Sequence, residues 1–361
     1  MTDSAQRIVV VVPTWVGDAV MATPTLRAIR RRLPDAHIAW LGGAAALDTL
    51  AGLDWADELL ADPSKGHGLR GLRRGAALLR AGRFDLAVLL SNAFRTALLA
   101  RLGRVRRRVG YDRDGRRLLL TDRLAVPRDE HGRFAVVAAL EYYLAVADHL
   151  GCDTSDRSMA LAVEAADRDA ADAMLAEAGV ADGERIVIIN PGASFGSSKL
   201  WMPERFAAVA DALIETRGAR IIINAAPAEK PIAAAVAEAM DHAPAITFAE
   251  RDNTLGLLKA LTARAGLMIT GDTGPRHVAA ALGCAVVTLF GPTDPFWTTI
   301  PFVRERIVRV EATCGPCQRK TCPLKPGPKH HICMRMITTE MVLAAAEQLL
   351  AEGEGGRGDG H

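Results

Sequence analysis

A single carboxylate, Asp18, follows the first apolar run of the chain, in the stretch VGDAVMATP (16–24). The run 8–12 predicts a strand, and Pro24 stands where a helix would begin. Ligands of open α/β sheets bind beyond the carboxyl ends of strands, so Asp18 is placed to act as a general base on a hydroxyl group. The alternative is a carboxylate that stabilises a helix N-terminus. A carboxylate base and a polyanionic diphosphate repel each other, so they should bind on opposite sides of a site. We therefore expect the phosphate loop in the second half of the chain.

A loop of small residues follows the apolar run 186–189, in NPGASFGSSKLW (190–201). The backbone amides around Gly192 and Ser194 can approach an anion closely, and Lys199 supplies a positive charge. This composition predicts one wall of a phosphate site.

A second loop of this kind occurs in MITGDTGPRH (268–277), where a strand leads through a turn into a helix. The N–H groups at the start of the helix can bind an anion. We expect Asp272 to cap the helix, and Thr273 and Gly274 to face a diphosphate. His277 is expected one turn further on at the same site, or else as a structural histidine.

Four cysteines near the carboxyl end of the sequence have the spacing C-x2-C-x4-C-x10-C and are accompanied by His330 and His331. Thiolates this close in sequence suit a structural zinc ion or an iron–sulfur cluster. The alternative is a set of reduced thiols, because disulfides are rare in cytoplasmic proteins. The candidate metal ligands are Cys314, Cys317, Cys322 and Cys333, whereas Cys152 and Cys284 stand apart and are expected in the core.

The scaffold for these loops is predicted by short apolar runs that alternate with helical patterns. Strands are expected at 8–12, 37–41, 85–90, 186–189, 220–223, 267–269 and 285–289, and helices at 25–32, 134–150, 204–217, 229–240 and 254–263. The pattern restarts after a polar stretch, 151–184. We therefore predict an α/β protein with two Rossmann-like domains facing a central cleft.

The bulk composition narrows the classes of function. Of 361 residues, 50% are hydrophobic and 5% aromatic, which suits parallel sheets covered by helices. A net charge of +2 argues against nucleic acid as a partner, and no apolar run is long enough for a membrane span. The start, MTDSAQRIVV, does not resemble a signal peptide, so we expect a cytoplasmic protein.

One segment, 101–123, is strongly basic, with nine arginines against three aspartates. It is either a solvated face or a surface for an anionic acceptor or for anionic lipid headgroups. In the second case we expect peripheral contact with a membrane.

Five motifs, in this order along the chain, resemble the lipopolysaccharide heptosyltransferases of glycosyltransferase family 9. They are VGDAVMATP (16–24), SNAFRTAL (91–98), NPGASFGSSKLW (190–201), DTGPRH (272–277) and FGPT (290–293). The resemblance covers nearly the whole chain. It implies a GT-B fold, ADP-L-glycero-D-manno-heptose as donor and a lipid A–core oligosaccharide as acceptor. It also implies inversion at the anomeric carbon without a cofactor or catalytic metal, at the inner face of the inner membrane.

The resemblance also implies a function for each of the two expected domains. An acceptor-binding domain is expected over 1–165 and a nucleotide-sugar-binding domain over 166–351. The second would contain a cysteine-rich insert at 312–335. The tail 352–361 is too polar and glycine-rich to order itself.

The resemblance also assigns roles to single residues. It makes Asp18 the base for the acceptor hydroxyl and Lys199 the ligand of the donor phosphates. Glu229, in AAPAEK, falls near the nucleoside, although Ala225 replaces the glycine usual at the strand exit. The remaining donor-binding candidates are Gly192, Ser194, Asp272, Thr273, Gly274 and His277, and the acceptor-binding candidates are Thr14, Trp15, Asn92 and Arg95.

Three other functions compete with this interpretation. GASFG (192–196) matches the nucleophile elbow G-x-S-x-G of hydrolases, with Asp272 and His277 following, but Pro191 interrupts the strand exit and the next helix signal comes only at Pro203. The cysteines and arginines could instead form a zinc-stapled module that binds nucleic acid. Finally, nothing in a Gly/Ser/Lys loop distinguishes heptose from another sugar, so a different nucleotide sugar is the main alternative donor.

Overall fold

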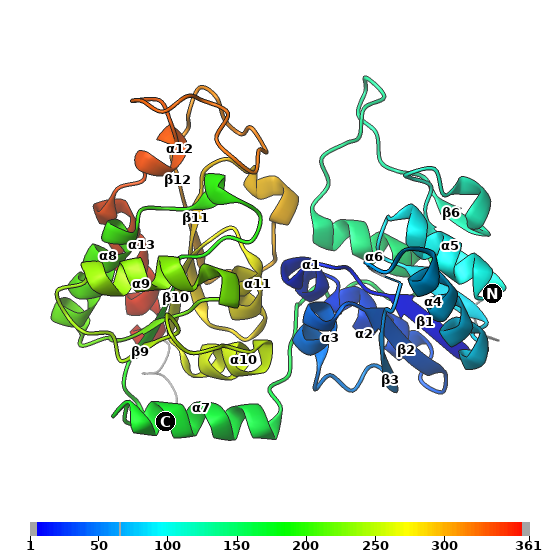
Figure 1. Ribbon diagram of the computed structural model, residues 1–361, viewed down its shortest axis with the longest axis horizontal. Coiled ribbons are helices and arrows are strands. Elements are labelled where there is room, and N and C mark those ends of the chain that lie inside the picture. Colours follow the sequence, from blue (N-terminus) through cyan, green and yellow to red (C-terminus); the bar gives the residue numbers. More distant parts are fainter. Residues whose placement is uncertain (1–5, 65, 356–361) are drawn as a thin grey trace. The chain divides into compact units, whose positions relative to one another are not determined.

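The computed structural model describes residues 6–64 and 66–355, which form two compact units (Figure 1). The first unit comprises the chain up to Leu161 together with Phe296–Pro301. The second comprises Ala162–Pro295 and the chain from Phe302 onward. Each unit contains its own parallel sheet of six strands.

The sheet of the first unit has the strand order β3-β2-β1-β4-β5-β6. Its central strands are runs of Val, Ile, Leu and Ala that are buried on both faces, as expected for a sheet covered on both sides. The strands are β1 (Arg7–Val11), β2 (His37–Gly42), β3 (Glu58–Ala61), β4 (Leu86–Leu89), β5 (Arg107–Tyr111) and β6 (Asp122–Leu124).

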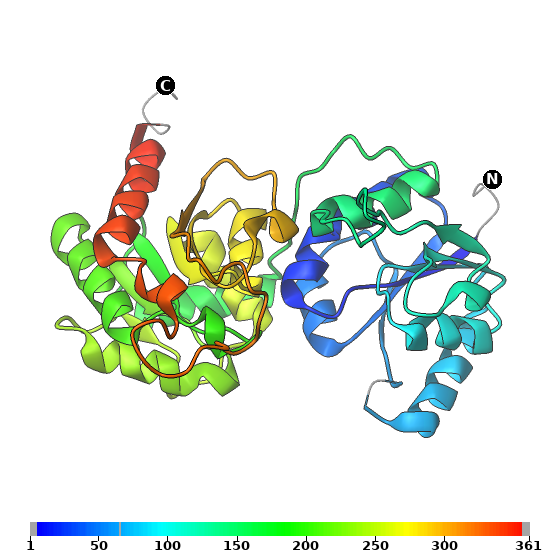
Figure 2. The ribbon, with the colours of Figure 1, turned by 90° about the horizontal axis from the view of Figure 1, so that it is seen from above.

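Two groups of helices cover this sheet (Figures 1 and 2). Helices α4 and α5 pack together on the face that carries Val9 and Val11, whereas α1 contacts α2, α3 and α6. The helices are α1 (Val16–Met21), α2 (Thr23–Arg32), α3 (Ala44–Leu50), α4 (Gly68–Gly82), α5 (Phe94–Leu102), the 3-10 turn η1 (Arg117–Leu119) and α6 (Ala139–His149).

The sheet of the second unit has the strand order β12-β11-β10-β7-β8-β9. Its three central strands, β10, β7 and β11, are buried along their whole length. The strands are β7 (Ile186–Asn190), β8 (Arg220–Ile223), β9 (Ile246–Thr247), β10 (Leu267–Gly271), β11 (Ala285–Phe290) and β12 (Glu305–Arg309).

Helix α8 contacts α9 and α13 in this unit, and α10 contacts α7 and α11. The helices are α7 (Ala165–Glu177), α8 (Pro203–Arg217), α9 (Lys230–Ala239), α10 (Leu255–Arg264), α11 (Gly274–Ala281), α12 (Ile332–Arg335) and α13 (Thr339–Gly355), with the 3-10 turns η2 (Ser197–Lys199), η3 (Pro227–Glu229) and η4 (Pro295–Thr298).

The strand order of each sheet reverses at one point, between β1 and β4 in the first unit and between β10 and β7 in the second. Loops at the carboxyl ends of such strands diverge and leave a crevice, which is where ligands bind in this kind of fold. The expected acceptor loops follow β1 and β4, and the expected donor loops follow β7 and β10. The topology therefore brings each pair of predicted loops to a switch point.

The predicted α/β class and all seven expected strands are confirmed, with ends that differ by one or two residues. The helix expected at 134–150 begins only at Ala139, because the chain before it forms a loop closed by a bridge between Arg128 and Phe134. The polar stretch 151–184 contains helix α7. Helix α13 continues to Gly355, and the rest of the expected tail lies outside the described residues.

The arginine-rich segment 101–123 is largely part of the fold. Arg116 is fully buried, and the guanidinium of Arg107 pairs with Asp122 at 2.9 Å. The exposed arginines do not form one patch. Arg104 lies before the amino end of strand β5, whereas Arg117 lies beyond its carboxyl end. Within 6–64 and 66–355, no helix combines the length and the apolar character that a membrane crossing requires.

Candidate functional site

The predicted base, Asp18, lies in the first turn of α1, directly beyond the carboxyl end of β1. Its side chain is half-buried, and its Oδ1 accepts a hydrogen bond from the hydroxyl of Tyr143 at 2.9 Å. Tyr143 comes from α6 and is 8% exposed. Burial, followed by the neighbouring Asp18 carboxylate, raises the pKa of the Tyr143 phenol well above its usual value, so this hydroxyl stays protonated and donates. The carboxylate is therefore held in a fixed orientation at the switch point.

The loop before Asp18 is open to solvent. Thr14 is exposed, and Trp15 occupies the N-cap position of α1 with 58% of its surface exposed. A large apolar side chain this exposed beside a buried strand is available to a ligand.

The predicted acceptor residue Asn92 follows β4 and is oriented by two side chains that the sequence did not point to. Its Oδ1 accepts from the guanidinium of Arg116 at 3.0 Å and from the hydroxyl of Tyr142 at 3.4 Å. Arg116 also donates to the carbonyls of Ser91 and Tyr111. Because the amide oxygen is occupied, the amide NH2 group of Asn92 is the end that can donate to an acceptor sugar or phosphate.

Arg95 is already engaged within the first unit. Its Nη1 forms an ion pair with Asp62 at 2.7 Å and also bonds the hydroxyl of Ser64. The pair ties helix α5 to the loop after β3. The side chain is still 35% exposed, so a second contact with an anionic acceptor is open to it.

The two predicted donor loops of the second unit are joined by Lys199. Its Nζ lies 2.6 Å from Oδ2 of Asp272 and 2.8 Å from the carbonyl oxygen of the same residue. The ammonium also lies over the ring of Phe195, at 4.7 Å from the centroid. An ammonium group has three N–H donors, so these bonds leave one N–H for an anionic oxygen.

Asp272 lies at the centre of the polar contacts around this turn. Its Oδ2 accepts from the hydroxyl of Thr293 at 2.9 Å, and its Oδ1 lies 3.6 Å from Arg276. Burial alone would raise the pKa of this carboxyl group, but Lys199, Arg276 and His277 outweigh it and lower the pKa. Asp272 is therefore ionised and fixes Lys199. It was expected to cap α11, but the cap position is held by Thr273 instead.

A buried ion pair that the sequence did not reveal supports the start of α11. Arg276 has no exposed surface, and its guanidinium binds both oxygens of Glu305 on β12, at 2.6 and 2.9 Å. The hydroxyl of Thr288 on β11 donates to the same carboxylate. The planar fork of an arginine matches a carboxylate in this way, and it anchors the first turn of the helix to the sheet.

A chain of amide side chains leads to Thr273 from the other direction. Asn253 donates to Asn224 at 2.6 Å, Asn224 donates to Asn190 at 2.6 Å, and Asn190 donates to Thr270 at 2.9 Å. The hydroxyls of Thr270 and Thr273 are 3.0 Å apart. The turn 272–274 is thus held by an ion pair on one side and by a hydrogen-bond chain on the other.

His277 is 2% exposed, and its Nδ1 has no hydrogen-bond partner among the described residues. Burial, and then the nearby Arg276, lower its pKa to about 3. The imidazole is therefore neutral near pH 7 and can offer a hydrogen bond to a phosphate, but not a positive charge.

Glu229 lies against the Gly/Ser loop. Its carboxylate accepts from the backbone N–H of Ala226 at 3.2 Å and from the hydroxyl of Ser194 at 3.4 Å. A Cβ on Gly192 would come within 2.2 Å of this carboxylate, so the close approach requires glycine. The two donor candidates Gly192 and Glu229 therefore form one packed unit.

The same contacts argue against the hydrolase interpretation. Ser194 donates to Glu229 rather than facing a histidine, and no α-helix follows it until α8 begins at Pro203. Asp272 is bonded to Lys199 and Thr293. A nucleophile elbow requires the serine to stand directly between a strand and a helix.

The cysteine-rich segment brings two histidines close to one of its four candidate cysteines. Cys314 is exposed, and Cys317, Cys322 and Cys333 are half-buried. Burial raises the pKa of the Cys333 thiol, and the other three thiols raise it further, which places all four in one neighbourhood. The group whose ligand atoms come within 4.8 Å of one another in the described chain is, however, Cys322 with His330 and His331.

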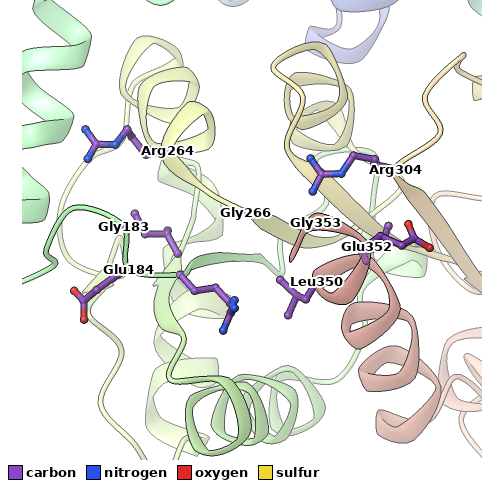
Figure 3. A pocket seen from close by; sticks show the side chains of 11 residues that line it. Gly183, Glu184, Arg264, Gly266, Arg304, Leu350, Glu352 and Gly353 are labelled. Atoms are coloured by element: carbon purple, nitrogen blue, oxygen red, sulfur yellow. The ribbon is translucent and has the colours of Figure 1, made fainter. Parts of the chain in front are cut away.

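A hollow of the second unit lies elsewhere (Figure 3). It encloses about 440 Å³ near the amino ends of β7 and β10, at the edge of the sheet opposite the donor loops. Its arginines are already engaged, since Arg264 pairs with Asp172 and Arg304 donates to the carbonyl of Gly283. It is therefore not the donor site.

Comparisons with known proteins agree with this geometry. Residues 72–327 match glycosyltransferase family 9 (heptosyltransferase). The sequence is 26% identical over 348 residues to lipooligosaccharide heptosyltransferase 2 of Campylobacter jejuni, covering 95% of this chain and 98% of that protein. The crystal structure of the glycosyl transferase family 9 protein from Veillonella parvula matches with a TM-score of 0.82 and 27% identity, over 98% of this chain and 99% of that one.

A further solved structure, E. coli ADP-heptose lps heptosyltransferase II, has the same fold, with a TM-score of 0.78 and 24% identity over 96% of this chain and 99% of that one. Two Rossmann-like units of this kind make up the GT-B architecture. The chain belongs to glycosyltransferase family 9, and it is a glycosyltransferase with the GT-B fold.

Proposed function

We propose that this enzyme transfers a heptose from ADP-L-glycero-D-manno-heptose to the inner core of lipopolysaccharide, with inversion at the anomeric carbon. Support comes from the family, from the heptosyltransferase of Campylobacter jejuni, and from the E. coli protein whose name specifies ADP-heptose. The observation that carries the proposal is the bond between Lys199 and the turn 272–274 at the switch point of the second sheet. A departing nucleoside diphosphate needs fixed positive charge and backbone N–H groups of this kind.

In this proposal Asp18 accepts the proton of the acceptor hydroxyl as its oxygen attacks the anomeric carbon. The new glycosidic bond forms while the bond to the diphosphate breaks, and ADP leaves with the electron pair. The bond from Tyr143 holds the carboxylate in place for this step. Asn92 and Arg95, with Thr14 and Trp15, would contact the acceptor, because they follow β4 and β1 at the same switch point.

The leaving group would be received in the second unit. Lys199 has one N–H left for a phosphate oxygen, and the backbone N–H groups of Gly274 and Arg276 lie in the first turn of α11, at the carboxyl end of β10. His277 would add a neutral N–H donor. Gly192, Ser194 and Glu229 would line the nucleoside side. These groups stabilise the developing charge, so the proposed transfer step needs no cofactor and no catalytic metal.

The acceptor side of the first unit has the chemistry of a lipid-facing surface. Trp15, Phe94 and Leu118 are 58%, 47% and 91% exposed, and they follow the carboxyl ends of β1, β4 and β5. Arg113 lies over the exposed ring of Phe134, at 4.6 Å from its centroid. Apolar side chains among arginines suit an anionic, lipid-linked acceptor, so we infer peripheral contact with the inner face of the inner membrane.

Vesicle binding tests this surface. The double variant Phe94→Ser with Leu118→Ser should weaken binding to phosphatidylglycerol vesicles by about tenfold or more, because each buried apolar side chain contributes about 1.5–3 kcal/mol. Val303→Ser is the matched control, since Val303 is 88% exposed but belongs to the second unit. Equal binding by the double variant and the wild type would remove the membrane proposal.

Product analysis tests the reaction itself. The purified enzyme is incubated with a lipid A–core acceptor and, in separate reactions, ADP-heptose, an ADP-hexose, a UDP-sugar and a GDP-sugar. Mass spectrometry should find one added heptose with ADP-heptose and no product with the UDP and GDP donors. Efficient transfer from a different nucleotide sugar would replace the proposed donor.

A further inference from the structure

A second cluster of reactive side chains lies in the loop between β12 and α12, outside the residues assigned to donor or acceptor. In the part of the chain that the structure describes, the sulfur of Cys322 and the ring nitrogens of His330 and His331 form the one group of this kind within 4.8 Å. We propose that these three side chains bind a divalent cation of the zinc class, which fastens this loop and, through it, the loop that carries Lys199.

The ring of His330 is held in one orientation by a hydrogen bond, as in a metal-binding histidine. Its Nδ1 lies 2.7 Å from the carbonyl oxygen of Leu324. A carbonyl only accepts, so Nδ1 carries a proton, and Nε2 is the nitrogen whose lone pair a metal ion could use. Metal-binding histidines are held by such a bond to a backbone carbonyl or carboxylate, which fixes the tautomer and the ring orientation. The rings of His330 and His331 are stacked, with centroids 4.6 Å apart and planes at 4°, so one ring must tilt for a nitrogen of each to bind the same ion.

The sulfur of Cys322 completes the set. It accepts a hydrogen bond from the backbone N–H of His331 at 3.3 Å, which holds the sulfur beside the two imidazole rings. All three side chains are half-buried, within reach of an ion from solvent. One thiolate and two imidazoles are the ligands that zinc prefers, and three protein ligands leave the fourth tetrahedral position to water.

The loop 310–331 is not held by regular secondary structure. Residues 310–331 contain no helix or strand, and a loop of this length is unusual in a compact domain. His331 has a left-handed backbone, with φ at 52°, which a non-glycine residue adopts only when its surroundings enforce it. A bound ion would supply the fixed contacts that an apolar core supplies elsewhere.

This loop lies directly against the donor loop. The backbone N–H of Ser198 donates to the carbonyl of Lys320 at 3.1 Å, and the Ser198 hydroxyl donates to the carbonyl of Arg319 at 2.5 Å. A Cβ on Gly196 would come within 2.2 Å of the Lys320 carbonyl oxygen. Ser198 precedes Lys199, and Lys320 lies two residues before Cys322. An ion at Cys322 would therefore position the backbone that presents Lys199.

Metal content of the full chain tests the site independently of the proposed function. After equilibration with Zn²⁺ and removal of the excess, the wild type should retain about one ion per chain, by mass spectrometry of the elements. Cys322→Ser and His330→Gln should each lose it. Cys314→Ser is the matched control, an exposed cysteine of the same segment outside the group, and should keep it.

Three results would overturn the site: no zinc retained by the wild type, equal loss from Cys314→Ser and Cys322→Ser, or the visible absorption of an iron–sulfur cluster. The second would point to a four-cysteine site instead. Substitution by Co²⁺ adds a readout of geometry, since a tetrahedral site with a thiolate gives d–d and sulfur-to-cobalt bands that Cys322→Ser should abolish.

The coupling to Lys199 rests on the proposed donor site, so it needs its own measurement. Chelator-treated wild type should bind ADP about fivefold or more weakly than the zinc-loaded protein, and added Zn²⁺ should restore the affinity. Lys199→Ala should bind ADP weakly while retaining its zinc. Unchanged ADP affinity after chelation would refute the coupling, whereas wild-type ADP affinity in Lys199→Ala would refute the donor site and leave the metal site intact.

Discussion

The hydrogen bond from Tyr143 to Asp18 makes a prediction about pH that no merely structural role would make. Replacing Tyr143 with phenylalanine removes one hydroxyl from a buried ring and leaves the packing surface almost unchanged. The donated bond favours the ionised carboxylate, so its loss raises the pKa of the Asp18 carboxyl group in the variant. A general base works only when ionised, and the variant should therefore lose activity on the acid side of its profile first.

The size of the effect follows from the contact. A hydrogen bond to a charged group contributes about 1.5–3 kcal/mol. Asp18 is half-buried, so water can replace part of the lost bond, and the lower end of that range applies. About 1.5 kcal/mol corresponds to a shift of about one pH unit. The acid limb of the profile should therefore move up by about one pH unit. Well above the pKa of the carboxyl group the rate should change little, and below it the variant should be up to about tenfold slower than wild type.

The assay is kcat/KM for the acceptor at saturating donor, measured from pH 5 to pH 9. Tyr142→Phe is the matched control, because Tyr142 neighbours Tyr143 on α6 but its hydroxyl bonds Asn92. That variant should raise the acceptor KM without moving the acid limb. An acid limb that stays in place in Tyr143→Phe, or that moves equally in both variants, would refute the assignment of Asp18 as a base oriented by Tyr143.

Three further perturbations concern the second unit. Lys199→Ala removes a charged donor worth about 1.5–3 kcal/mol, so ADP affinity measured by calorimetry should fall about 10- to 100-fold, and an unchanged value would exclude the phosphate role. Gly192→Ala places a Cβ 2.2 Å from the carboxylate of Glu229 and should weaken ADP binding. Gly43→Ala is the control, because Gly43 has open space around it and its substitution should leave ADP binding unchanged. Equal ADP affinities of the two variants would contradict the packing argument. His277 is buried, and its pKa is about 3 in the folded chain but about 6.5 in the unfolded chain. Between pH 3 and pH 6.5 the unfolded chain therefore binds one more proton than the folded chain. The contribution of His277 to the free energy of unfolding is complete above pH 6.5 and is lost as the pH falls, by about 1.4 kcal/mol per pH unit. In urea unfolding between pH 4.5 and pH 7.5, His277→Gln should make the free energy of unfolding depend less steeply on pH than in the wild type.

The central strands and the position of the loops were predictable from the sequence, because apolar runs of Val, Ile and Leu fit only strands covered on both faces. The loops that carry Asp18 and Lys199 and the turn 272–274 were predictable as well, since each of them comes after such a run. Five strands were missed. Charged residues interrupt the apolar pattern of β3, β5, β6 and β12, and β9 has only two residues.

The partners of these residues could not be predicted, because they come from distant parts of the chain. Tyr143 lies 125 residues from Asp18, and the carboxylate that holds Arg276 on helix α11 belongs to Glu305 on strand β12, 29 residues away. Arg116 belongs to a segment whose composition indicates a solvated face, yet the structure buries it against Asn92. Local spacing suggested four cysteines as metal ligands, accompanied by two histidines, and folding brings these histidines to Cys322.

The most direct measurement is Asp18→Asn, with turnover and ADP affinity determined on the same preparation. The substitution keeps the size of the side chain and its ability to accept from Tyr143, but it removes the base. Turnover with ADP-heptose should fall by about 10²-fold or more while the dissociation constant for ADP stays within a factor of about two. Wild-type turnover, or a loss of ADP binding as large as that in Lys199→Ala, would contradict the division of work between the two units.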